Sequence, residues 1–175
     1  MIVIPFSWNL QDQLAGDDIL LIKLARPVKS SKYVSPVCLP KPNSREPRQG
    51  DQCLTAGWGL EYEVDVDHTI IPKHVNLEVA SKAECGEFYG QFNITINRDM
   101  LCVGGHSEGG RDSCKYDSGG PLVCLGDNGR WQYTGITSFG AGCGSAGVPG
   151  IYTKVNVHLN WIEKTIKEEI SDLVN

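Results

Sequence analysis

The sequence lacks the features that mark several common classes of protein. Its 16 Lys and Arg residues form no basic cluster and the net charge is −5, so no surface could neutralise several phosphates, and nucleic acid is excluded as a partner. No apolar run is long enough to cross a bilayer, because Lys23 interrupts the stretch ILLIKL after a few residues, and no membrane partner is expected. The cysteines include no C-x-x-C pair, and we predict no metal site and no cofactor.

Cysteine, by contrast, is abundant. Seven cysteines in 175 residues, far apart in the chain, predict a disulfide framework and an oxidising compartment, hence a secreted protein. The sequon Asn93-Ile94-Thr95 agrees with secretion and makes Asn93 a predicted glycosylation site. The first ten residues, MIVIPFSWNL, have no basic n-region, too short an apolar run and no small-residue cleavage site for a signal peptide. We therefore expect that the beginning of the protein is missing.

Apolar segments of strand length, separated by turn residues, dominate the chain. The expected strands are an edge strand over 1–8, a buried strand over 17–28, and further strands over 53–60, 74–81, 121–125 and 130–139. The last two flank Gly126-Asp127-Asn128-Gly129, which predicts a hairpin. Residues 28–52, rich in Pro, Ser, Lys and Gly, predict a linker. The acidic stretch 61–68 predicts a solvated loop in preference to a metal site.

The C-terminal segment has a different hydrophobic period. Leu159, Ile162, Ile166, Ile170 and Leu173 recur at steps of three and four, which predicts a helix with one apolar face packed on the preceding strands. Short strands, glycine-rich turns and one closing helix together predict an all-β barrel or sandwich.

The stretch RDSCKYDSGGPLVC, residues 111–124, combines acids, a serine, glycines and cysteines. A serine hydroxyl acts as a nucleophile only with a base to take its proton and donors to hold the oxyanion, while Gly119 and Gly120 leave room for a substrate backbone. A lone Asp-Ser-Gly would predict no more than a turn. The whole string, however, resembles the nucleophile segment of the trypsin-like, chymotrypsin-fold serine proteases of the S1 family, and Ser118 matches the nucleophile.

Further stretches extend the resemblance over nearly the whole chain. DDILLIKL resembles the strand whose aspartate, here Asp18, orients the catalytic histidine, and CLTAGWG resembles the strand that opens the second barrel. GITSFGAGCGSAGVPGIYTKV resembles the stretch that lines the substrate pocket, and VNVHLNWI resembles the start of the C-terminal helix. The resemblance implies that Asp112 lies at the bottom of the specificity pocket and selects Arg or Lys before the scissile bond. It also implies that Asp117 pairs with a new amino terminus after zymogen cleavage.

Smaller details of the site follow from the same resemblance. It implies that Ser138 lies beside the catalytic aspartate, that Gly140 and Gly150 keep the pocket walls open, and that Phe139 replaces the usual tryptophan. Six cysteines alone would allow 15 connectivities. The family pattern selects Cys53 with Cys124, Cys85 with Cys102, and Cys114 with Cys143, and leaves Cys38 unpaired.

The chain departs from the family pattern in two ways. The A-x-H-C segment that supplies the catalytic histidine is absent, as is an Ile-Val-Gly-Gly-like terminus; the four histidines present, His68, His74, His106 and His158, all follow Asp18 and are expected at the surface or in loops. These losses and the unpaired Cys38 map to one upstream stretch, so we expect N-terminal truncation. The second departure is Tyr116. The family has glycine at this position, and the backbone N–H groups of that glycine and of the serine form the oxyanion hole. The loss of one of these donors costs about 3 to 4 kcal/mol of transition-state stabilisation.

The predicted fold class is all-β, a chymotrypsin-like double β-barrel with a complete second barrel and C-terminal helix (47–175) and a remnant of the first barrel with the interdomain linker (1–46). The predicted function is a serine endopeptidase with trypsin-like preference, inactive as this chain. Its expected partners are protein or peptide substrates with Arg or Lys, and protein protease inhibitors. The alternatives are a non-catalytic pseudoprotease that serves as a binding module, and a small disulfide-stapled structural domain.

Overall fold

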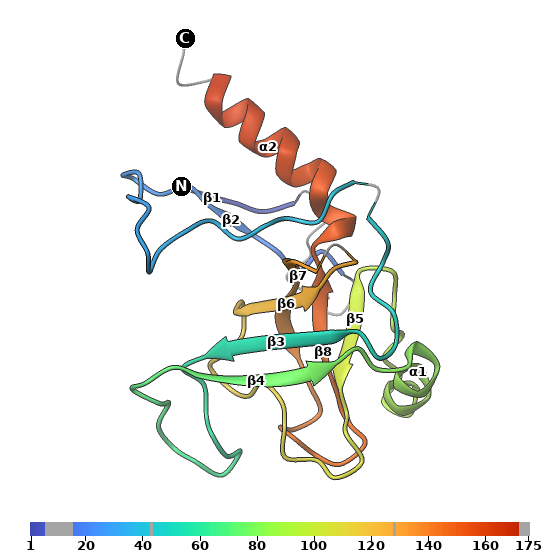
Figure 1. Cartoon of the computed structure of the whole chain (residues 1–175). Coiled ribbons are helices and arrows are strands. Elements are labelled where there is room, and N and C mark those ends of the chain that lie inside the picture. Colours follow the sequence, from blue (N-terminus) through green and yellow to red (C-terminus); the bar gives the residue numbers. More distant parts are fainter. Residues whose placement is uncertain (6–15, 43, 128, 172–175) are drawn as a thin grey trace.

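The structure is a computed structural model that describes residues 1–5, 16–42, 44–127 and 129–171, with the backbone alone for residues 169–171. Short antiparallel strands make up most of the regular structure, and the chain ends in a helix (Figure 1). The elements in chain order are β1 (Ile2–Val3), β2 (Leu21–Ile22), β3 (Gln52–Gly57), β4 (Lys73–Glu78), α1 (Lys82–Gly90), β5 (Met100–Gly104), β6 (Pro121–Leu125), β7 (Trp131–Phe139), β8 (Pro149–Lys154), η1 (Asn156–His158) and α2 (Leu159–Ser171).

Six of the strands form one curled antiparallel sheet in the order β4-β3-β6-β7-β8-β5. The edge strands β4 and β5 approach each other beyond the end of β4, where Val79 forms an antiparallel bridge with Val103. The backbone N–H of Ala80 continues this contact by donating to the carbonyl of Cys102 at 2.9 Å. The sheet thereby closes on itself, as the predicted second barrel of a chymotrypsin-like fold requires.

The barrel core is built from alternate strand residues that point inward. The largest fully buried side chains include Leu77, Leu122 and Tyr152, which lie on three different strands. A second cluster joins α1 to β5 and β8 through Tyr89, Met100 and Ile151. Each fully buried aliphatic side chain contributes about 1.5–3 kcal/mol to folding.

Three disulfides reinforce this barrel: Cys53–Cys124, Cys85–Cys102 and Cys114–Cys143, the same pairs that the resemblance implies. Cys53 and Cys124 face each other on the paired strands β3 and β6, and their bond closes the longest of the three loops, with a sequence separation of 71. The chain-entropy model gives this bond about 4 kcal/mol of stabilisation and the Cys85–Cys102 bond about 3 kcal/mol. Cys38 is free and exposed.

The prediction of a long buried strand over 17–28 is wrong. Only Leu21–Ile22 is a strand, paired with Ile2–Val3, and within 17–28 only Ile19 is buried. Leu20 and Leu24 are 49% and 60% exposed, because no described residue covers the outer face of this two-stranded sheet. Ile19 instead packs against Val155 and Leu159 at the start of the C-terminal helix, which joins this segment to the barrel.

The prediction of a single helix with one buried apolar face differs from the structure in two respects. α1 was not predicted, although Ser81 is its N-cap and accepts a hydrogen bond from the backbone N–H of Glu84, a Ser-x-x-Glu pattern typical of helix starts. In α2, Leu159 and Ile162 are buried as expected, but Ile166 is 47% exposed because the helix leaves the barrel after its first turns (Figure 1). The side chain of Ile170 and the whole of Leu173 lie outside the described residues.

The other strand predictions agree in position with the described elements but not in their exact bounds. The segments 53–60 and 74–81 overlap β3 and β4, and the edge strand predicted over 1–8 is limited to Ile2–Val3, with residues 6–8 outside the described part of the chain. β6 pairs with β7 as a hairpin, although Asn128 of its turn lies outside the described residues. Within the predicted linker 28–52, Gln52 alone of the described residues belongs to a strand, as the first residue of β3, and residues 61–68 are exposed throughout. No helix in the described part of the chain has the length and apolar character needed to span a membrane.

Candidate active site

Asp18 and Ser138 meet although 120 residues separate them in the sequence. The hydroxyl of Ser138, near the end of β7, donates a 2.6 Å hydrogen bond to Oδ2 of Asp18. The backbone of Asp18 is held as well, because the hydroxyl of Thr153 on β8 donates to its carbonyl at 2.9 Å. The exposed Asp18 carboxylate is therefore fixed to the barrel by two strands.

Ser118 lies in the turn before β6 and is exposed. Its hydroxyl forms no hydrogen bond with any described residue, so no histidine of the chain is in place to take its proton. His68 packs edge-on against the Tyr116 ring, with ring centroids 6.0 Å apart, and His74 lies exposed on β4. His106 lies half-buried in the loop after β5. The expectation of a surface or loop position is wrong for His158, which is 5% exposed in η1.

A cavity of about 240 Å³ connects Ser118 to Asp112. Its other lining residues include Ser138, Gly140 and Gly150, so the structure gathers all the residues that the sequence places in the substrate pocket. The disulfide Cys114–Cys143 joins two walls of this cavity. A cavity of this size admits a single long side chain beside the serine.

Asp112 is the most deeply placed acid of this cavity to be predicted from the sequence, and two backbone groups hold its carboxylate. Its Oδ1 accepts a hydrogen bond from the backbone N–H of Ser113 at 2.9 Å, and its Oδ2 accepts one from Gly144 at 3.1 Å. Burial raises the pKa of the carboxyl to about 6, although both backbone donors act to lower it. The carboxylate is thus held in place but lacks a cation among the described residues, and a ligand cation would fill that gap.

Position 150 requires glycine because its backbone lies very close to this carboxylate. A Cβ there would lie 3.0 Å from Oδ1 of Asp112 and 3.3 Å from the ring of Tyr152. The Tyr152 hydroxyl in turn forms a 2.9 Å hydrogen bond with the Ser113 side chain. Any larger residue at 150 would push against the carboxylate of Asp112.

Asp117 lines a second cavity, of about 220 Å³, which shares Asp112 with the first. Its carboxylate accepts hydrogen bonds from the backbone N–H of Gly59 at 2.8 Å and of Cys114 at 3.0 Å. A Cβ at Gly57 or Gly59 would overlap this carboxylate, which explains the two glycines of the Gly-Trp-Gly stretch. Among the described residues, no lysine, arginine or amino terminus pairs with it.

Tyr116 adopts a backbone conformation that favours glycine. Its φ is +75°, and its side chain is 67% exposed. A left-handed conformation costs a residue with a Cβ about 1–2 kcal/mol. Neither Tyr116 nor Ser118 uses its backbone N–H in a hydrogen bond with a described residue, so both donors are available to a ligand.

Two charged residues that line the pocket were not predicted from the sequence, Glu63 and Lys115. Glu63, from the acidic loop 61–68, lines the cavity of Asp112, and its Oε2 accepts a hydrogen bond from the backbone N–H of Cys143 at 3.3 Å. This placement follows from a contact between residues 80 positions apart, and no local pattern signals it. The lining of the cavity therefore contains two acids, Asp112 and Glu63, and one lysine, Lys115.

Comparison with known proteins identifies clear relatives. The family model described as trypsin matches residues 3–162. Phenoloxidase-activating factor 3 of Holotrichia diomphalia is 44% identical over 154 residues, which cover 86% of this chain and 42% of that protein. Serine protease 1 of Rattus norvegicus is 43% identical over 161 residues, covering 91% of this chain and 58% of that protein. Trypsin II-P29 of Gallus gallus is 43% identical over 151 residues, covering 86% and 56%. The chain thus spans 42% to 58% of the length of these three relatives.

Proposed function

The chain belongs to the trypsin family of serine proteases, and from this premise we propose that it carries the nucleophile and specificity pocket of a serine endopeptidase that cleaves proteins after Arg or Lys. The observation that carries the proposal is the shared cavity. It joins the exposed Ser118 to the Asp112 carboxylate, so a cationic side chain bound to Asp112 places the following peptide bond beside the serine hydroxyl.

In the proposed reaction, Oγ of Ser118 attacks the carbonyl carbon of the scissile bond. A histidine takes its proton, Asp18 orients that histidine, and the backbone N–H groups of Tyr116 and Ser118 hold the oxyanion that forms. Because Ser118 has no base among the described residues, the histidine must be one that these 175 residues do not supply, and the chain by itself turns over no substrate.

Asp117 has a separate proposed role in activation. The 220 Å³ cavity beside its carboxylate would receive a new amino terminus released by zymogen cleavage, whose ammonium group would pair with the carboxylate. Support comes from the two backbone donors that already fix the carboxylate at the cavity wall. The pair would hold the serine loop, and with it the backbone donor of Tyr116, in one conformation.

Further parts of the proposal concern domain organisation and location. We assign residues 1–46 to a remnant of a first barrel with a linker, and residues 47–175 to the second barrel. Secretion is supported by the three disulfides, and the exposed Asn93 is accessible for glycosylation. The expected partners are protein substrates with Arg or Lys and protein protease inhibitors that insert a basic side chain next to Asp112.

A second function is favoured by Tyr116. An exposed tyrosine at the oxyanion position, held at φ +75°, would crowd the leaving-group side of the site. A pseudoprotease that binds basic peptides without cleaving them would use the same Asp112 cavity and would have no need of the free Ser118 hydroxyl.

Two measurements test the proposal. The mature protein and its Ser118→Ala variant, both produced recombinantly, are treated with a fluorophosphonate probe, and the labelled residue is mapped by mass spectrometry. Peptide substrates with Arg, Lys or Phe before the scissile bond are then compared. We expect the label on Ser118, loss of label in Ser118→Ala, and cleavage after Arg and Lys but not Phe. No label and no cleavage, with p-aminobenzamidine still bound, would support the binding module, while cleavage after Phe would refute the assigned role of Asp112.

A further inference from the structure

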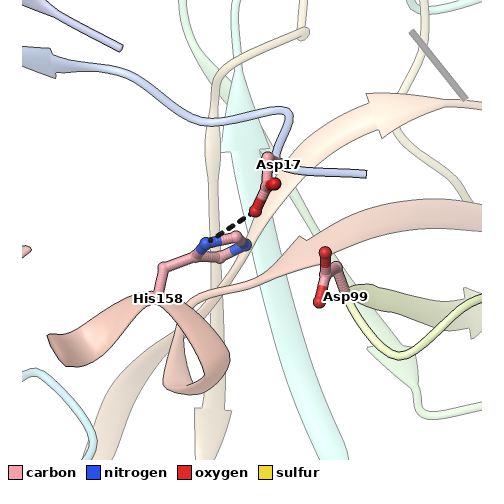
Figure 2. A group of neighbouring side chains, drawn as sticks. All are labelled: Asp17, Asp99 and His158. Carbon is pink, nitrogen blue, oxygen red and sulfur yellow. Dashed lines mark ion pairs between the residues drawn. The ribbon is translucent and has the colours of Figure 1, made fainter. Parts of the chain in front are cut away.

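Three ionisable side chains from distant parts of the chain meet outside the proposed catalytic residues. Asp17 precedes β2, Asp99 precedes β5 and His158 ends η1, yet each offers one ligand atom and these atoms all lie within 4.8 Å of one another. Figure 2 shows the imidazole of His158 with Asp17 on one side and the carboxylate of Asp99 beyond its far end. The group thus connects the N-terminal segment, the barrel and the start of the C-terminal helix.

His158 is the group in this cluster that lacks a satisfactory partner. It is 5% exposed; its Nδ1 lies 3.5 Å from Oδ1 of Asp17, and its buried Nε2 has no hydrogen-bond partner in the structure. In Figure 2 the ring nitrogen remote from the dashed line, Nε2, points toward the side on which Asp99 lies. Buried polar nitrogens are nearly always bonded, so this one points to an absent ligand.

The charges of the cluster are also unbalanced. Two carboxylates lie together, and no described lysine or arginine forms an ion pair with either of them. An imidazole nitrogen beside two carboxylate oxygens is a set of side-chain atoms that transition metals accept as ligands.

The backbone holds two of the three ligands in place. The N–H of Lys154 donates to the carbonyl of Asp99 at 2.7 Å, and the N–H of Asp99 donates to the side chain of Asn97 at 2.9 Å. The carbonyl of Asp17 accepts a 2.7 Å bond from the N–H of Ile19, whose side chain is buried against the helix. Asp17 itself has a side chain that is 26% exposed, which leaves a route for an ion from solvent.

We propose that Asp17, Asp99 and His158 bind a divalent transition-metal ion, with Zn²⁺ as the ion whose chemistry fits best. An imidazole with two carboxylates suits Zn²⁺ better than Ca²⁺ or Mg²⁺, which take oxygen ligands, and three protein ligands leave a position for water. Bonds of about 2.1 Å in a tetrahedral site place the ligand atoms about 3.4 Å apart. Binding therefore draws the three side chains closer together.

The consequence of binding is a link between three segments of the fold. The ion would tie the loop that contains Asp17 to the barrel and to the C-terminal helix. Asp18 projects from the same loop, so the ion would also restrict the carboxylate that Ser138 contacts. Metal binding should accordingly raise the thermal stability of the chain, and this effect does not depend on protease activity.

The test uses the oxidised 175-residue chain, freed of metal by a chelator and dialysed. Because the exposed Cys38 thiol is itself a potential zinc ligand, every variant carries Cys38→Ser. Zn²⁺ binding is measured by calorimetry, Co²⁺ by its visible absorption bands, and the melting temperature with and without Zn²⁺. The variants are Asp99→Asn and His158→Gln. The matched control is His106→Gln, because the Nε2 of His106 is also buried without a partner but lies outside the cluster.

We expect one Zn²⁺ per chain and a higher melting temperature for the parent and for His106→Gln. Affinity should fall at least tenfold in Asp99→Asn and in His158→Gln, and the zinc-dependent rise in melting temperature should vanish. Should His158→Gln not fold, Asp17→Asn replaces it, because Asp17 is partly exposed. Absence of 1:1 binding to the parent, or binding that both variants leave unchanged, would overturn the proposal.

Discussion

The charge of Asp112 should make the stability of the folded chain depend on pH in a defined way. Burial raises the pKa of this carboxyl from 3.8 to about 6, so the folded state favours the protonated acid. A group with a raised pKa contributes stability that is fully present below pH 3.8 and is lost as the pH rises through about 6. The shift of about two units corresponds to about 3 kcal/mol, an upper value because solvent reaches part of the cavity.

A single substitution at one pH would not isolate this effect. In Asp112→Asn the desolvated charge is gone, which stabilises the fold by up to about 3 kcal/mol at neutral pH. The new amide, however, presents an NH₂ group to one of the two backbone donors, Ser113 or Gly144, and a donor left without an acceptor costs about 1–3 kcal/mol. The two effects are of similar size and opposite sign, so their sum is uninformative.

The dependence of the difference on pH avoids this cancellation. Urea unfolding of the oxidised chain and of Asp112→Asn is measured from pH 3.5 to 8, with Asp67→Asn in the exposed loop as a control for the removal of one carboxylate. The free energy of unfolding of the wild type, minus that of Asp112→Asn, should fall by about 3 kcal/mol across this range, with its steepest slope between about pH 4 and 6. A difference that stays flat within about 0.5 kcal/mol would refute the assigned burial of the charge.

The same titration controls ligand binding with the opposite sign. Benzamidine, an aromatic amidinium ion, should bind the ionised carboxylate and so favour the form that folding alone disfavours. Its affinity should be constant above about pH 7 and fall about tenfold for each pH unit below about 6. The affinity of Asp112→Asn should be low and independent of pH over this range. Calorimetry at matched ionic strength measures both.

Three further predictions follow from backbone and packing. Tyr116→Gly should raise the free energy of unfolding by about 0.5–1 kcal/mol, because relief of the left-handed conformation exceeds the entropy that a glycine adds to the unfolded chain; a destabilised variant in urea unfolding would contradict this. Gly150→Ala should destabilise the fold by about 1–3 kcal/mol and weaken benzamidine binding, measured by calorimetry, because its Cβ meets Asp112; unchanged affinity would argue against the cavity wall. Limited digestion with subtilisin should cut first within residues 22–39, all exposed, and leave 47–175 intact by mass spectrometry, whereas equally rapid loss of both parts would oppose the domain division.

Local patterns predicted those parts of the fold whose structure depends on neighbours in the sequence. The apolar segments 53–60 and 74–81 were correctly predicted as strands, and the structure shows that β3 and β4 within them each have a more buried and a more exposed face in the antiparallel sheet. The same reasoning failed at 17–28, since an apolar run becomes a buried strand only where other elements cover both its faces. α1 was missed despite its Ser81 cap, because its other side chains show no apolar period.

The residues of the candidate site likewise fall into those that a local pattern predicts and those that it does not. Ser118, Asp112 and Asp117 were predicted as site residues from one motif of 14 residues. The motif is informative because few other kinds of site require these residue types in this order. Glu63 in the pocket, and the meeting of Asp17, Asp99 and His158, arise from contacts across long separations. Such contacts depend on how the barrel closes and on where the N-terminal segment attaches, and no local sequence pattern predicts either.

The attachment of Asp18 shows how a residue of the N-terminal segment is held by the barrel. Asp18 belongs to the N-terminal segment, yet both of its anchors, Ser138 on β7 and Thr153 on β8, come from the barrel. Ile19 secures the same loop by packing against Val155 and Leu159. The six-stranded barrel therefore holds the carboxylate in position. In the proposed reaction, a histidine brought to this surface would meet an acid that is already fixed, so the ordering entropy left for assembly would be that of the histidine and of the Ser118 hydroxyl.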